Sequence, residues 1–386
     1  MVLRIYLDTQ DYIVLYKNRN AQRQLIYDFL TTNVASGKIE IGFSYAIISE
    51  FLQDFDLKHR DDRIQRAKLI KALCGKNAFK FVSKLNREEP FSYTGDWTPN
   101  MGRLLNLDEL SATFLEEIKK SQPTLTRKQR NALKNKRGLR RLIKENMHLF
   151  DSVANFQQYG IPVSKKFVED NMLLRFMAGE LSRYDAEEEF LSIVTDIELF
   201  ISAWFEYADK GNMLFENIKA PGRAIQESIG QMREILIAAR EDKKRLKELE
   251  SGIRKQGQIG VFGERLNELK RNQTVIPEID KAWLKGMIRD KKVMKYFPES
   301  FWDSVVCYIK QSLKTPEKMK DSDFGDLLHA TYIPYCDLWR GDKDFSNTLI
   351  SGKVPGMKKI VPRLVDLPNR IEQGLVAELL SSATPN

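Results

Sequence analysis

The sequence predicts an α/β protein whose central parallel sheet is built from both ends of the chain, with an all-helical insertion between them. Strand and helix patterns alternate over residues 1–90, strand patterns almost vanish over 91–299, and the alternation returns over 300–386. Strands that are separated by helices normally pair in parallel beneath those helices. We therefore expect residues 1–90 and 300–386 to form one domain.

In the first part, three apolar runs predict strands, at 2–8, 38–44 and 78–83. Helical spacing predicts three helices, at 24–37, 45–55 and 61–75. Gly37 and Gly75 suit helix C-termini, and Ser44 suits an N-cap.

The insertion is predicted to contain five helices, at 107–120, 127–150, 166–182, 187–210 and 224–255. One apolar stripe runs through the fourth, so we expect it to be continuous. In the last part, 300–313 and 322–336 are predicted helices, with Pro334 kinking or ending the second. Strands are predicted at 337–341 and within 358–366.

Composition is consistent with a polyanionic partner, although many unrelated soluble proteins are also basic. The 386 residues carry a formal net charge of +9, and Lys and Arg release counterions from phosphates. The three cysteines show no CxxC spacing, which is typical of buried thiols in a reducing compartment. Neither a signal peptide nor a run of about 18 apolar residues is evident. We expect a soluble cytoplasmic protein with no membrane partner.

Four acidic residues fall where a parallel sheet would gather them. Asp8 ends the first strand, Glu50 lies on the helix after the second, Asp326 opens the helix before a late strand, and Asp342 follows that strand. Ligands bind beyond the carboxyl ends of parallel strands, and clustered carboxylates suit Mg²⁺ or Mn²⁺.

Each acid also has an ordinary structural interpretation. Asp8 suits an N-cap, Glu50 a solvated helix position, Asp326 a helix-dipole partner and Asp342 a turn. It is their joint pattern that favours a metal site.

These motifs resemble those of the PIN-domain ribonucleases. The matching segments are IYLDTQ with Asp8, SYAIISEF with Glu50, DLLHA with Asp326 and RGDKDF with Asp342. The resemblance covers roughly 1–90 and 300–386, and not the helical insertion. It implies a PIN-like three-layer fold and an endonuclease in which those four acids hold Mg²⁺ or Mn²⁺. The metal would activate water for attack on phosphorus, leaving 5′-phosphate and 3′-hydroxyl ends.

Nearby residues add weaker candidates. Asp323 either supports the metal site or partners the helix dipole, and Asp344 either extends the metal ligands or caps the turn before Phe345. His329 is interpreted as a structural histidine beneath the site in preference to a catalytic one. Arg340 stands where the family usually has Thr or Ser. It is either a phosphate contact or the mark of an altered site.

A basic segment at 127–144 contains nine Lys or Arg residues and no acid. On a helix, one face of it would present Arg130, Lys134, Arg137 and Arg141. That stripe predicts contacts with a nucleic-acid backbone, although a solvated helix face would have the same pattern.

Together these features predict an RNA-cleaving, metal-dependent endoribonuclease, with a possible protein partner bound through the insertion. Two alternatives stay open. One is a structure-selective DNA nuclease, and the other is a non-catalytic nucleic-acid-binding or scaffold protein with a degenerate site. No P-loop, G-x-S-x-G elbow or zinc spacing supports another chemistry.

Overall fold

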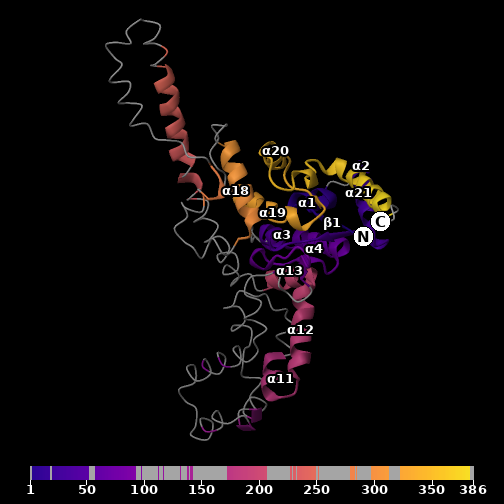
Figure 1. Cartoon of the computed structure of the whole chain (residues 1–386). Helices are drawn as coiled ribbons and strands as arrows, with labels where there is room; N and C mark the ends of the chain where they lie inside the picture. Colours follow the sequence, from indigo (N-terminus) through magenta and orange to yellow (C-terminus); the bar gives the residue numbers. More distant parts are fainter. Residues whose placement is uncertain are drawn as a thin grey trace.

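The computed structural model describes residues 2–17, 20–51, 57–92, 172–206, 233–248, 297–312 and 322–382, with isolated residues between these ranges. Helices predominate around a small parallel sheet (Figure 1). The two ends of the chain meet in this sheet, so the predicted α/β class is confirmed.

The sheet has three strands in the order β2–β1–β5, and all of them are parallel. β1 (Leu3–Tyr6) pairs along its length with β2 (Ile39–Gly42). On its other side it pairs with β5 (Leu338–Trp339), where Tyr6 lies opposite Trp339. The first strand is thus central, and its carboxyl end lies between segments from both parts of the chain.

Single bridges extend this sheet at both edges. Phe43 bridges Ala78 beyond β2, and Trp339 bridges Ile360 beyond β5. The strand predicted at 78–83 is only β3 (Ala78–Phe79), which pairs antiparallel with β4 (Phe91–Ser92). Sheet structure therefore continues past residue 90.

The strand predicted within 358–366 is wrong. The segment contains two 3₁₀ turns, Met357–Lys359 and Leu364–Asp366, with the single bridge at Ile360 between them. Pro362 explains the early end of pairing, because proline has no backbone N–H to donate to a neighbouring strand.

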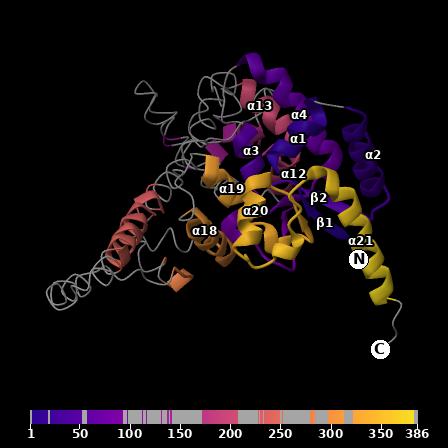
Figure 2. The same ribbon diagram turned by 90° about the horizontal axis from the view of Figure 1, so that it is seen from above.

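Helices from both parts of the chain surround the sheet (Figure 2). The first part supplies α1 (Thr9–Lys17), α2 (Ala21–Ala35), α3 (Tyr45–Phe51) and α4 (Arg60–Cys74). The last part supplies α18 (Glu299–Ser312), α19 (Ser322–Ala330), α20 (Lys343–Ser351) and α21 (Leu367–Ser382).

Both faces of β1 carry buried side chains. Successive side chains on a strand point to opposite faces. Leu3 lies against Gly374 of α21, whereas Tyr6 stacks on Tyr332 and Trp339, with ring centroids 5.0 and 6.5 Å away. The aromatic face therefore lies toward α19, which carries the candidate site.

Helix α19 differs from its prediction at both ends. It begins at Ser322, so Asp326 lies within the helix and does not open it. It ends at Ala330, and a 3₁₀ turn at Ile333–Tyr335 follows. Pro334 suits the first turn of a 3₁₀ segment but not a continuing α-helix, which accounts for the early end.

Part of the predicted helical insertion packs on the α/β part. The structure contains α11 (Met172–Ala178), α12 (Arg183–Thr195) and α13 (Ile197–Glu206). α13 packs against α4, where Lys71 Nζ lies 2.6 Å from Asp196 Oδ2. α11 and α12 extend away from the sheet (Figure 1).

The single helix predicted at 187–210 is wrong. Asp196 separates α12 from α13, and its Oδ1 accepts hydrogen bonds from the backbone N–H groups of Glu198 (3.0 Å) and Leu199 (3.2 Å). Aspartate favours such caps because its side chain competes with the helical backbone for hydrogen bonds. The apolar stripe continues across the break, so the hydrophobic pattern alone does not reveal it.

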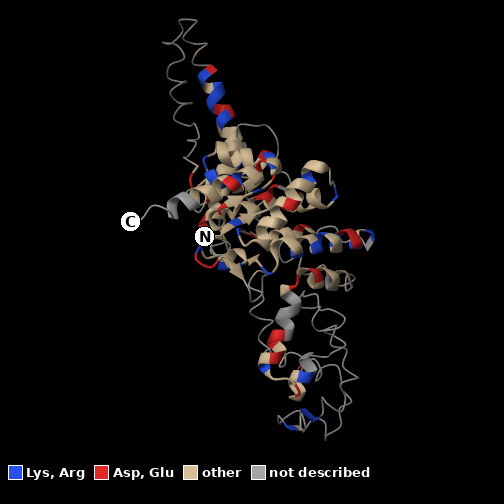
Figure 3. Cartoon of the chain, turned by 90° about the vertical axis from the view of Figure 1, so that its right-hand side faces the viewer, with Lys and Arg blue, Asp and Glu red and all other residues tan. Residues whose placement is uncertain are grey.

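Other predicted elements fall largely outside the described residues, including the helices at 107–120 and 127–150. Residues 233–248 are helical within the predicted 224–255. Charges of both signs cover their outer part (Figure 3). Across the described residues, no helix combines the length and apolarity that a membrane crossing requires.

Candidate metal centre

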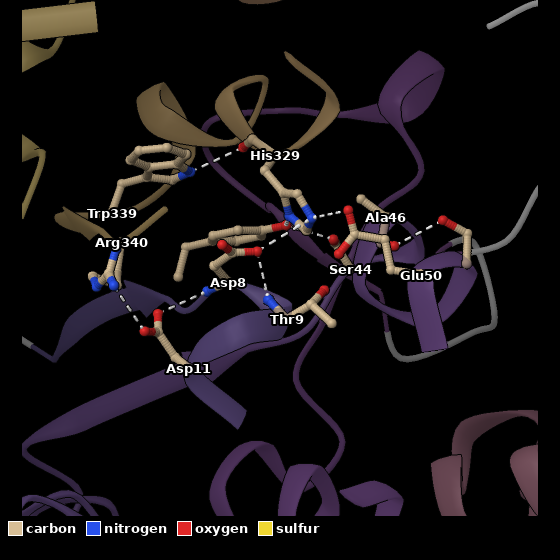
Figure 4. Close-up of polar contacts among 11 residues, drawn as sticks. Asp8, Thr9, Asp11, Ser44, Ala46, Glu50, His329, Trp339 and Arg340 are labelled. Atoms are coloured by element: carbon tan, nitrogen blue, oxygen red, sulfur yellow. Dashed lines mark hydrogen bonds and ion pairs between the residues drawn. The ribbon is translucent and has the colours of Figure 1, made fainter. Parts of the chain in front are cut away.

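Three side chains meet beside the carboxyl end of β1 (Figure 4). Asp8 follows β1, Glu50 lies on α3 after β2, and His329 lies on α19. His329 Nε2 is 3.4 Å from Asp8 Oδ1 and 3.2 Å from Glu50 Oε1. One ligand atom of each residue lies within 4.8 Å of the other two, close enough to share a cation.

Of the other two predicted acids, Asp326 interacts electrostatically with the triad of Asp8, Glu50 and His329, and Asp342 interacts with Asp326. Burial raises the pKa of Asp326 to about 7, and the charges of Asp8, Asp342 and Glu50 add to the increase, whereas His329 opposes it. All four acids therefore share one electrostatic neighbourhood. Among the described residues, however, only Asp8, Glu50 and His329 form the close group.

His329 has a fixed orientation. Its Nδ1 lies 2.5 Å from the hydroxyl of Tyr6, which lies 2.8 Å from Ser44 Oγ. The backbone carbonyl of His329 accepts a hydrogen bond of 2.9 Å from Trp339 Nε1. The side chain of Ser44, the predicted N-cap of α3, thus contacts Tyr6. These contacts aim Nε2 at the carboxylates.

Charge compensation within the triad is strong. Burial alone would lower the pKa of His329, but the charges of Glu50 and Asp8 raise it to about 9. Burial would raise the pKa of Glu50, and His329 reverses this into a net decrease. For Asp8, burial outweighs His329 and the pKa stays raised. Buried carboxylates that lie together favour a neighbouring cation.

A second buried pair supports the loop after β1. The backbone N–H of Thr9 donates to Asp8 Oδ1 (2.6 Å), and that of Asp8 donates to Asp11 Oδ2 (3.2 Å). Arg340 Nη2 lies 3.2 Å from Asp11 Oδ1. Burial nevertheless raises the pKa of Asp11 to about 7, with Arg340 opposing. Arg340 is only 8% exposed, and its contact with a phosphate stays a prediction.

The remaining acidic candidates have local structural roles. Asp342 caps α20, accepting from the N–H groups of Asp344 (2.8 Å) and Phe345 (3.1 Å). Asp344 is exposed in the first turn of that helix. Asp323 accepts a hydrogen bond of 2.6 Å from the hydroxyl of Tyr308. A metal role for these three stays a prediction.

The basic stripe is only partly described. Arg130 and Lys134 lie outside the described residues, whereas Arg137 and Arg141 are helical and exposed. Their contact with a nucleic-acid backbone stays a prediction.

Sequence reasoning placed His329 beneath the site but missed its contacts with both carboxylates, and it missed Asp11. His329 lies three residues after Asp326, which places both on one helical face. Asp11 likewise lies three residues after Asp8, on the helix that begins at Thr9. That spacing was the available signal, but the partners of both residues come from distant segments.

Comparison of the chain with protein-family models, with curated proteins and with solved structures finds no match.

Proposed function

We propose that the protein is a metal-dependent nuclease that hydrolyses RNA phosphodiester bonds. The observation that carries the proposal is that the carboxylates of Asp8 and Glu50 lie close enough to bind one cation. Asp326 interacts electrostatically with both. Buried oxygen ligands at the end of a parallel sheet suit a divalent ion and a phosphate ester.

The residues of the triad fit such an ion. Asp8 and Glu50 would hold it through carboxylate oxygens, and Asp326 and Asp342 would add negative charge beside them. A bound Mg²⁺ or Mn²⁺ supplies an activated water and polarises the phosphoryl oxygen. The hydrogen bond from Thr9 N–H and the Asp11–Arg340 pair keep Asp8 in position.

The resemblance to PIN-domain ribonucleases supports the same reaction. Asp8 lies after the central strand β1, and Glu50 lies on α3, the helix that follows β2. The parallel sheet joins both ends of the chain. A PIN-like three-layer arrangement of this part is our proposal.

RNA is the favoured substrate, by the same resemblance. A net charge of +9 and the exposed Arg137 and Arg141 support a polyanion in general. They do not distinguish RNA from DNA, so substrate choice is part of the test.

The test is cleavage of single-stranded RNA and of flap DNA by the full chain, with Mg²⁺, Mn²⁺ or EDTA. Asp8→Asn and Asp326→Asn should each lower the rate by more than about 100-fold, because loss of a supporting partner alone typically costs 10- to 100-fold. Asp61→Asn, at an exposed acid in α4, is the matched control. Full activity in folded Asp8→Asn would refute the proposal.

One observation favours the non-catalytic alternative. His329 contacts both carboxylates, and its raised pKa lets an imidazolium neutralise them where a metal would. A binding protein with such a closed site would show no divalent-ion affinity. Titration of the full chain with Mn²⁺ separates the two possibilities.

A further inference from the structure

The spacing around His329 Nε2 matches that of ligands around one ion. The nitrogen lies 3.4 and 3.2 Å from its two carboxylate oxygens. Ligands at about 2.0–2.2 Å from a metal lie roughly 3.0–3.5 Å from one another in tetrahedral or octahedral geometry. Both distances from Nε2 fall in this range, and the ligand atoms of all three residues lie within 4.8 Å of one another.

Both carboxylates contact His329 Nε2 without meeting strict hydrogen-bond geometry. His329 is 1% exposed, and within the described part of the chain no acceptor meets hydrogen-bond geometry at Nε2. A buried N–H normally points at its acceptor, because an unmade hydrogen bond costs about 1–3 kcal/mol. His329 Nε2 points between the carboxylates of Asp8 and Glu50, as it would if all three residues bound one metal ion.

The other ring nitrogen has the partner that a ligating histidine needs. Metal-binding histidines almost always donate their second N–H to a fixed acceptor, which sets the tautomer. Tyr6 occupies that position at 2.5 Å from Nδ1, and Ser44 can accept the proton of its hydroxyl. With Nδ1 protonated, Nε2 carries the free lone pair.

We propose that His329 Nε2 is a metal ligand alongside Asp8 and Glu50, that Tyr6 positions it, and that the centre selects Mn²⁺ or another first-row transition ion over Mg²⁺. This inference rests on the metal site of the proposed function and adds the identity of the ion. Imidazole suits transition ions, whereas Mg²⁺ prefers an all-oxygen shell with several waters.

Pulsed electron paramagnetic resonance of the Mn²⁺-loaded full chain tests the ligand directly. We expect electron spin-echo modulation from an imidazole nitrogen, which changes when histidine is labelled with nitrogen-15. The signal should vanish in His329→Gln and persist in His59→Gln, at the start of α4. The wild-type measurement does not depend on whether a variant folds. Mn²⁺ binding without nitrogen modulation, or no Mn²⁺ binding, would overturn the inference.

Affinity measurements test the selectivity and the role of Tyr6. His329→Gln should weaken Mn²⁺ binding by about 10- to 100-fold and change Mg²⁺ binding far less. Tyr6→Phe keeps the ring stack but removes the hydroxyl, so Mn²⁺ affinity should fall about 10-fold while nitrogen modulation remains. Equal losses for both ions in His329→Gln would overturn the selectivity.

The inference and the nuclease proposal can fail separately. Nitrogen modulation without RNA cleavage supports the ligand assignment and refutes the nuclease. Cleavage that requires Asp8, in a Mn²⁺-bound chain without nitrogen modulation, supports the nuclease and refutes the ligand assignment.

Discussion

Replacement of Arg340 by methionine should destabilise the protein by leaving Asp11 buried without its cation. The two side chains are 10% and 2% exposed, and their closest atoms are 3.2 Å apart. Met approximates the length of the aliphatic part of Arg, so the change removes mainly the charge and its hydrogen-bonding groups. The perturbation therefore probes the buried pair with little change of packing.

The expected magnitude follows from the state of the pair. Removing one partner of a buried ion pair typically costs about 3–5 kcal/mol. Within the described part of the chain, Nε and Nη1 of Arg340 make no hydrogen bond, so the native cation is itself incompletely compensated. We therefore expect the lower end of this range, a loss of about 3 kcal/mol in the free energy of unfolding, at a pH where Asp11 is ionised.

The penalty should grow with pH. Burial raises the folded-state pKa of Asp11 to about 7, above about 3.9 in an unfolded chain. A raised pKa gives stability that is complete below the unfolded value and is lost as pH rises through the folded value. Arg340 lowers the folded-state pKa of Asp11. Without Arg340 this pKa is higher, so the stability of the protein continues to fall with pH over a wider range. The cost should be larger near pH 8.5 than near pH 5.5.

The assay is urea unfolding followed by tryptophan fluorescence at both pH values. Asp11→Asn combined with Arg340→Met removes both charges, and its amide oxygen can still accept from Asp8 N–H. This double variant should recover about 2 kcal/mol relative to Arg340→Met. A penalty that is equal at both pH values, without recovery in the double variant, would refute the reasoning.

Three further predictions concern the metal centre. A Cβ at Gly325 would lie 2.7 Å from Glu50 Oε1, so Gly325→Ala should weaken Mn²⁺ binding with little loss of stability; unchanged calorimetric affinity would contradict this. Asp342→Ala should cost about 1 kcal/mol through the lost cap, whereas Asp342→Asn should keep the cap, and reduced cleavage in a fully stable Asn variant would reveal a metal role. Because the pKa of His329 is raised to about 9, a ligating nitrogen must lose a proton near pH 7. Mn²⁺ affinity should then rise with pH up to about 9, and calorimetry in buffers of different ionisation enthalpy should detect the released proton; affinity independent of pH would exclude that exchange.

Local pattern was enough to predict the parallel arrangement of β1, β2 and β5 and the positions of Asp8 and Glu50 beside them. Strand periodicity ends at Asp8, and a helix carrying Glu50 follows the next strand. Parallel pairing then forces the carboxyl ends of neighbouring strands to one edge. Pattern did not locate the break at Asp196, because the apolar stripe continues across it, nor the start of α19.

Only tertiary structure decided the partners within the site. The contact of Tyr6 with His329 joins residues 323 positions apart in sequence, and no periodicity links such residues. In the same way Arg340 meets Asp11 because β5 lies beside β1. The sequence determined that Asp8 and Glu50 gather at the sheet, since one ends the central strand region and the other lies on the helix after the neighbouring strand. Packing between distant segments decided which cationic groups face those acids, because burial and side-chain orientation arise only when the two ends of the chain meet.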